Sequence, residues 1–167
     1  MWMDIKGAIV ADTVYAEGKL VAKDVGFTLP GITLQTADVQ AMGTMSVPLV
    51  GLLDDMELAI TKIGIDLGLS KLSRLEKMNL EFRWVQNVVK SDGKNAVEGC
   101  KAFVRCMPKA LPGIGVEIGG ASENELTYGV SRVQIYCAGT EYLLVDRLSQ
   151  KLRIDGKDYM DGITKLL

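Results

Sequence analysis

Hydrophobic and polar side chains alternate along most of this chain, which is the pattern of strands with one buried face. The two clearest runs are long: Leu80, Phe82 and Trp84 are predicted to point to one face, and Glu81 and Arg83 to the other. Short turn signals separate the runs. The expected strands lie at 12–16, 20–29, 31–36, 56–63, 80–89, 97–108, 126–136, 141–147 and 151–154.

Two segments depart from the alternation and predict helices. Leucines recur at steps of two to three after Leu67, and Ser70 is a candidate N-cap, so a short amphipathic helix is expected at 70–77. The end of the chain, 158–167, predicts a second short helix. About eight strands with one short internal helix and a short C-terminal helix indicate a mainly β protein, an antiparallel β-sandwich or barrel. A single domain over 1–167 is expected.

The stretch 39–53 carries no charge, although Asp38 precedes it and Asp54 follows it. It joins two predicted strands, so it is interpreted as a connection, and Pro48 argues against a central strand. Its Met, Val and Leu content is too apolar for a flexible linker. Two interpretations remain: a loop folded back over its own core, or an arm that docks on another copy of the protein.

Composition excludes several kinds of site. The chain has no histidine, which removes Ser-His-Asp and Cys-His catalytic arrangements and the commonest metal ligand. The glycines at 113, 115 and 119 miss the spacing of a dinucleotide-binding loop. A net charge of −2 provides no electrostatic footprint for holding nucleic acid tightly. No catalytic, cofactor-binding or metal-binding residue is therefore predicted, and the protein is not expected to be an enzyme.

The three cysteines form no CxxC pair, and Cys100 and Cys106 are too far apart along one strand to be bridged. Reduced thiols in a cytosolic setting are expected. The first residues lack the positive charge and apolar length of a signal peptide. No stretch approaches the roughly 20 apolar residues of a membrane helix. These features predict a protein that folds in the cytoplasm.

Several segments, taken in order, resemble one known family. The most specific are FTLPGIT at 27–33 and the ending from Tyr136 to Leu167 with its IDG turn; the charge-poor arm and DMELAI at 55–60 lie between them. In this order, the chain from about Asp12 onward resembles the major tail tube protein of contractile-tailed phages and of R-type bacteriocin particles. The resemblance is weakest between 90 and 121.

The resemblance implies a protomer that assembles as hexameric rings, which stack into a hollow tube inside a contractile sheath. Baseplate and tail-terminator proteins would be further partners, and DNA would only pass through the lumen if the particle is a phage. No membrane anchor is expected. Assembly would occur in the host bacterial cytoplasm, and the product would be part of a virion tail or a bacteriocin particle. Secreted tubes of type VI secretion share the ring architecture, but the C-terminal pattern favours the phage-tail branch.

Two sets of residues follow as hypotheses for such a tube. The inter-ring contact would come from the arm, through Met42, Met45, Val47, Leu49, Val50, Leu52 and Leu53. The lumen wall would come from the polar side of the two long strands, through Glu81, Arg83, Lys101 and Arg105. The N-terminal residues and the loop at 111–121 are second candidates for contacts between copies. The alternative from another class is a soluble β-barrel that binds a small molecule.

Overall fold

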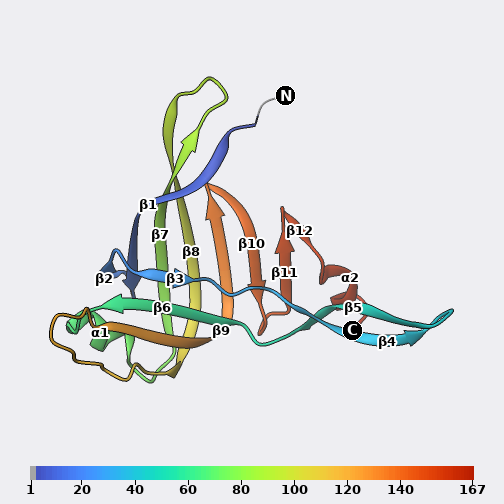
Figure 1. Cartoon of the computed structure of the whole chain (residues 1–167). Coiled ribbons are helices and arrows are strands. Elements are labelled where there is room, and N and C mark those ends of the chain that lie inside the picture. Colours follow the sequence, from blue (N-terminus) through green and yellow to red (C-terminus); the bar gives the residue numbers. More distant parts are fainter. Residues whose placement is uncertain (1–2) are drawn as a thin grey trace.

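The computed structural model describes residues 3–167, and it is mainly β (Figure 1). Within this range all strand pairs are antiparallel. The strands are β1 (Ile5–Ala16), β2 (Lys19–Lys23), β3 (Gly26–Thr28), β4 (Leu34–Gln40), β5 (Thr44–Leu53), β6 (Glu57–Ile63), β7 (Met78–Val89), β8 (Asn95–Ala110), β9 (Glu123–Cys137), β10 (Thr140–Asp146), β11 (Lys151–Ile154) and β12 (Lys157–Asp158), and the helices are α1 (Leu67–Leu72) and α2 (Asp161–Thr164).

Ten strands form one sheet, in which the continuous order is β12-β11-β10-β9-β8-β7-β1-β2. The long strand β9 has two partners along one edge: its residues 123–129 pair with β6, and its residues 132–137 pair with β10. β6 in turn pairs with β3, and both cross the lower part of β7 and β8 in Figure 1. The sheet is open, because β2 and β12 end the order without pairing with each other. Of the two expected forms, a sandwich or a barrel, the closed barrel was therefore wrong for the single chain.

The core lies between the lower part of β7–β9 and the layer made by β6, β3 and α1. Alternate residues of each strand supply it, as the hydrophobic pattern predicts: Leu80 and Phe82 are buried, and Trp84 packs against the core. The Phe27 ring lies on Phe82, with their centroids 4.7 Å apart. Further buried side chains come from β1, β6, α1, β8 and β9, namely Val14, Leu58, Ile60, Leu72, Val104, Leu126, Tyr128 and Val133.

Tight turns with two left-handed residues join the short hairpins. The turn between β1 and β2 has Glu17 at φ 49° and Gly18 at φ 78°, as predicted for Gly18. The β9–β10 turn has the same conformation at Ala138 and Gly139. This geometry matches the right-handed twist of the flanking strands. The expected single strand at 20–29 is broken at Asp24, whose φ is 51°, and its second half leaves β1 to pair with β6.

The segment 39–53 is not an irregular connection: it contains the end of β4, a turn and all of β5. β4 and β5 form a separate two-stranded hairpin, which projects from the body at the right of Figure 1. Met42 and Gly43 make its turn, with φ values of 51° and 121°. Pro48 lies within β5, opposite Thr36. A proline is tolerated there because each strand of a two-stranded ribbon has a free edge.

Both helices are shorter than expected. The helix predicted at 70–77 is instead α1, because Asp66 rather than Ser70 is the N-cap: its carboxylate accepts the Leu69 N–H at 2.8 Å. Asp66 also pairs with the buried Lys62 ammonium at 2.7 Å. At the end of the chain, α2 forms only one turn, preceded by the two-residue strand β12.

Tyr128 joins α1 to the sheet and provides a test of the core. Its ring is fully buried, and its hydroxyl donates a hydrogen bond of 2.8 Å to the Leu72 carbonyl. We expect Tyr128→Phe to lower the free energy of unfolding by about 1 kcal/mol, because the buried carbonyl loses its partner. Urea denaturation measures this change. Tyr142→Phe, at an exposed tyrosine, is the matched control and should leave stability unchanged; equal effects of the two substitutions would contradict the assignment.

Candidate assembly surfaces

The arm, defined here as the β4–β5 hairpin at 34–53, keeps most of its apolar side chains outside the body of its own chain. Met42, at the tip, is fully exposed. Half-buried positions are Val47, Leu49 and Leu53, and the exposed apolar ones are Val39, Met45, Val50 and Leu52. The strands of the arm pair only with each other. Such an apolar projection is unusual on a protein that stays alone, since large exposed apolar surfaces mark interaction sites.

The base of the arm rests on the C-terminal helix. A Cβ at Gly51 would come within 2.9 Å of the Met160 sulfur, and the φ of 99° at this position favours glycine. The Asp54 N–H donates to the Thr33 carbonyl at 2.9 Å and closes the hairpin at its root. A cavity of about 450 Å³ lies between this root, the β10–β11 turn and α2. The arm is therefore anchored at one end and free at the other.

The second surface is the face of the sheet opposite the core, called here the polar face. The register places Arg83 of β7 opposite Lys101 of β8, and Asn79 opposite Arg105. All four residues predicted for a lumen wall lie on this face, at neighbouring positions of two paired strands. The Arg83 guanidinium is held by Glu81 and lies 4.5 Å from the centre of the Tyr15 ring. The polar face is thus a mixture of both charges with aromatic rings.

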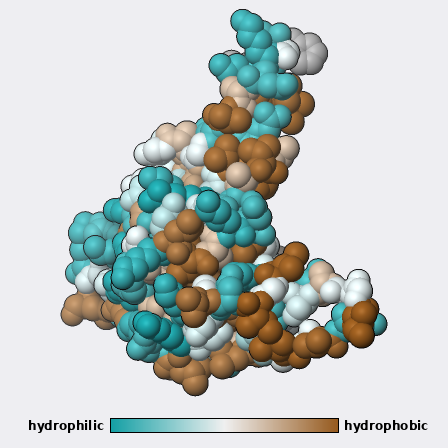
Figure 2. Space-filling view, turned by 90° about the vertical axis from the view of Figure 1, so that its left-hand side faces the viewer, coloured by the Kyte–Doolittle hydropathy of each residue, from teal (hydrophilic) through white to brown (hydrophobic). Residues whose placement is uncertain are grey.

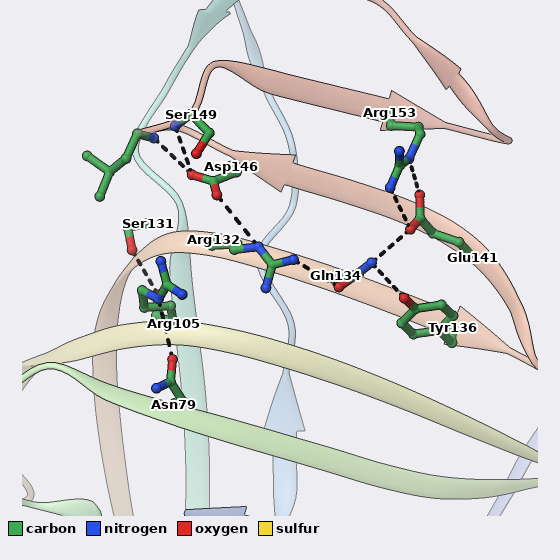
Figure 3. Close-up of polar contacts among 11 residues, drawn as sticks. Asn79, Arg105, Ser131, Arg132, Gln134, Tyr136, Glu141, Asp146, Ser149 and Arg153 are labelled. Carbon is green, nitrogen blue, oxygen red and sulfur yellow. Dashed lines mark hydrogen bonds and ion pairs between the residues drawn. The ribbon is translucent and has the colours of Figure 1, made fainter. Parts of the chain in front are cut away.

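The polar face continues across β9 to β11 as a hydrogen-bonded network, which the sequence analysis missed (Figure 3). Gln134 is its centre: its amide nitrogen donates to the Tyr136 hydroxyl at 2.7 Å and to the Glu141 carboxylate at 2.8 Å. Arg132 donates to the Gln134 carbonyl oxygen at 3.0 Å. On the far side, Arg153 binds Glu141 through two nitrogens. The alternate polar residues 132, 134 and 136 were the available signal for this network.

Two carboxylates of the network are held ionised. The hydrogen bond from Arg153 lowers the pKa of Glu141, although partial burial acts in the opposite direction. For Asp146, burial raises the pKa, but the Ser149 and Leu148 N–H groups and the Arg132 charge together outweigh it, so the pKa is lowered. The distance from the Arg132 Nε to the Asp146 carboxylate is 3.6 Å. The lowered pKa values keep Glu141 and Asp146 charged, so these carboxylates act as ion-pair partners rather than as acids.

The two secondary candidates for contacts between copies are also exposed. The loop at 111–121 has no regular structure and leaves Val116 and Ile118 almost fully exposed. The start of β1 exposes Ile5, Ile9 and Val10 beside the β7–β8 hairpin. The start of β1 and the β7–β8 hairpin form the upper part of the molecule in Figure 2, which shows hydrophobic surface there. Residues 1–2 lie outside the described range.

Among residues 3–167, no group of three or more Cys, Asp or Glu side chains is placed to hold a metal ion. Every helix in this range falls short of the length and hydrophobicity needed to cross a membrane.

Comparison with solved structures shows which proteins share this fold. The chain is similar to the sheath/tube terminator of an extracellular contractile injection system, PVC, in its extended state, with a TM-score of 0.52 and 13% identity over 75% of this chain and 92% of that one. It is also similar to a chain of the PVC sheath-tube complex, with a TM-score of 0.51 and 13% identity over 75% and 87%. A third match is the tube-terminating cap of the anti-feeding prophage, with a TM-score of 0.50 and 16% identity over 76% and 88%. At these identities the likeness shows a shared fold.

The family model described as phage tail tube protein FII matches residues 8–167. The chain therefore belongs to the phage tail tube protein FII family, and it is a structural component of a tail tube. No curated protein matches the chain. Family membership agrees with the resemblance found in the sequence. It favours a tail tube protein over the alternative of a β-barrel that binds a small molecule.

The pair of Glu141 and Arg153 predicts a pH-dependent stability. Because Arg153 lowers the pKa of Glu141 in the fold, the carboxylate stabilises the protein above its ordinary pKa near 4.5, and this contribution is lost as the pH falls through the lower folded value. We expect Glu141→Gln to lower the free energy of unfolding at pH 7 by roughly 1 kcal/mol, and the difference should vanish at a pH below the lowered folded pKa of Glu141.

Urea denaturation at both pH values measures this effect. Glu76→Gln is the control, because Glu76 pairs with Arg74 where both side chains are more than 60% exposed, and such pairs contribute little. A Glu141→Gln deficit that persists unchanged at the lower pH would show that the charge is not its cause.

Proposed function

We propose that this protein forms the inner tube of a contractile tail or injection particle by the stacking of hexameric rings, giving a hollow conduit. Family membership supports the tube role. The structural neighbours belong to sheath-tube and terminator assemblies, which supports a sheath around the tube and a terminator at its end. A baseplate is proposed at the other end. Assembly is proposed in the host bacterial cytoplasm, and the finished particle is a virion tail or a bacteriocin.

The observation that carries the proposal is the arm. Met42, Met45, Val50 and Leu52 stay exposed in the single chain, so burial against a second copy would remove them from water at roughly 25 cal/mol per Å². Methionines at the tip suit such a contact, because their flexible side chains fill irregular surfaces. We assign the inter-ring contact to residues of the turn and β5: Met42, Met45, Val47, Leu49, Val50, Leu52 and Leu53.

The open sheet supports ring formation in the same way. The sheet ends at β2 on one side and at the two-residue β12 on the other. Unpaired edges of this kind are exposed to uncontrolled pairing, and closing the sheets of neighbouring subunits into one ring removes them. Head-to-tail contacts close into a ring when the rotation between copies permits it.

The polar face is proposed to line the lumen. It carries Arg83, Lys101 and Arg105 together with Glu81, while the whole chain has a net charge of −2. Ion pairs with Glu81, Asp146 and Glu141 compensate Arg83, Arg132 and Arg153 on this face, which weakens its attraction for a passing polyanion, since tight binding of DNA needs many uncompensated cations. DNA, where the particle carries it, would therefore be in transit only.

The arm is tested by a charge placed in its apolar surface. Leu52 is half-exposed in the single chain, so Leu52→Asp should leave the protomer folded. We expect it to abolish tubes, because a carboxylate would have to be buried without a partner in the contact between rings. Negative-stain electron microscopy of the purified protein measures tube formation, and circular dichroism confirms folding.

Leu52→Met is the matched control, since it keeps an apolar side chain of similar size, and tubes are expected. Normal tubes from a folded Leu52→Asp protein would exclude this part of the arm from the contact. Absence of tubes from the unsubstituted protein under all conditions would argue against self-assembly itself.

The lumen is tested by labelling the polar face. Lys101→Cys in a Cys137→Ser background presents one new exposed thiol, because Cys100 and Cys106 are buried. A maleimide gold cluster attached there before assembly should add density along the tube axis in averaged cross-sections. Density at the outer rim of the tube would place the polar face on the outside.

A further inference from the structure

Two of the three cysteines lie side by side on neighbouring strands. Cys100 of β8 is directly opposite Cys137, the last residue of β9, and their sulfur atoms are 3.2 Å apart. Both are free thiols in this structure. The third, Cys106, lies six residues further along β8, within the core.

The position of the pair in the ladder favours a bond between the two sulfurs. The neighbouring pair, Gly99 and Ala138, is joined by a hydrogen bond from the Ala138 N–H to the Gly99 carbonyl at 3.1 Å. Hydrogen-bonded and non-hydrogen-bonded pairs alternate in an antiparallel ladder, so Cys100 and Cys137 form a non-hydrogen-bonded pair. The Cα atoms of such a pair lie about 4.5 Å apart, which is within the range of disulfide-bonded cysteines.

The two thiols differ in their surroundings. Cys100 is only 2% exposed, and burial raises its pKa to about 12. Cys137 is partly exposed, and the Gln86 amide donates to its sulfur at 3.5 Å. Gln86 also binds Glu98, which pairs with Lys6 at 2.9 Å, so polar side chains border the Cys137 side of the pair. An oxidant from solution would therefore meet Cys137 first.

We propose that Cys100 and Cys137 are a dithiol site that an oxidised thiol such as glutathione disulfide converts to a cross-strand disulfide, while Cys106 stays reduced. The Cys137 thiolate attacks one sulfur of glutathione disulfide, forms a mixed disulfide and releases one glutathione thiolate. The Cys100 thiol then loses its proton and attacks the Cys137 sulfur. The second glutathione leaves, so two protein thiols are oxidised and one glutathione disulfide is reduced to two thiols.

The bond would fasten the base of the β7–β8 hairpin to β9, next to the β9–β10 turn. This hairpin, with the start of β1 paired to it, extends above the other strands in Figure 1. The oxidation chemistry is independent of the tube. Its timing rests on the proposed function, because a particle released from a reducing cytoplasm enters a medium in which disulfides persist.

The experiment uses the full chain, reduced, freed of reductant and exposed to a series of ratios of reduced to oxidised glutathione. Samples are alkylated in denaturant and analysed by intact mass and by tryptic peptides. Trypsin cuts after Lys101 and Arg105, which separates the peptides of Cys100 and Cys106. We expect a loss of about 2 Da, as two thiols become a disulfide, a linked peptide pair containing Cys100 and Cys137, and an alkylated Cys106.

Single substitutions test the order of attack. Cys100→Ser should accumulate the mixed glutathione disulfide at Cys137, because the resolving thiol is missing, whereas Cys106→Ser should oxidise like the unsubstituted chain. Three alkylated cysteines at every ratio would overturn the proposal. A persistent mixed disulfide on the unsubstituted chain, or links between chains on a non-reducing gel in place of the internal bond, would overturn it equally.

Discussion

The architecture depends on β9, which pairs with two different strands along the same edge. β8 pairs along the other edge of β9, while β6 and β10 divide the remaining edge between them. The β8–β9 register shifts between Arg105 and Cys106, beside the division between the two partners, and such a bulge bends a sheet. Because of this bend, β6 and β3 cover the core, whereas β10, β11 and β12 continue the sheet beyond β9. One face of the long strands is thus covered, and the other carries the charged network.

Local alternation was enough to predict the two faces of the long strands. Leu80 and Phe82 are buried, and Glu81 and Arg83 lie on the opposite side, because the side chains of a strand alternate whatever its neighbours are. The same reasoning located the turn at Gly18 and the loop at 111–121. A mainly β fold with two short helices followed from these patterns.

Features that depend on register between distant strands could not be predicted in this way. Cys100 and Cys106 lie near each other along one strand, but the cross-strand neighbour of Cys100 is Cys137, which only the β8–β9 pairing reveals. Gln134 and Glu141 meet for the same reason. The open sheet and the pairing of β4 with β5 are likewise properties of strand arrangement. The α1 boundary was missed because Asp66 offers a carboxylate cap that also pairs with Lys62, which made Ser70 unnecessary.

The separation of the arm from the core has a consequence for how such a protein can change. Apart from its root near Gly51, the arm shares no strand pairing with the body, so its side chains contribute little to the free energy of folding. Substitutions at sites without shared contacts act almost additively. On the role proposed for the arm, substitutions there can strengthen or weaken the contact between copies with little effect on the stability of the protomer.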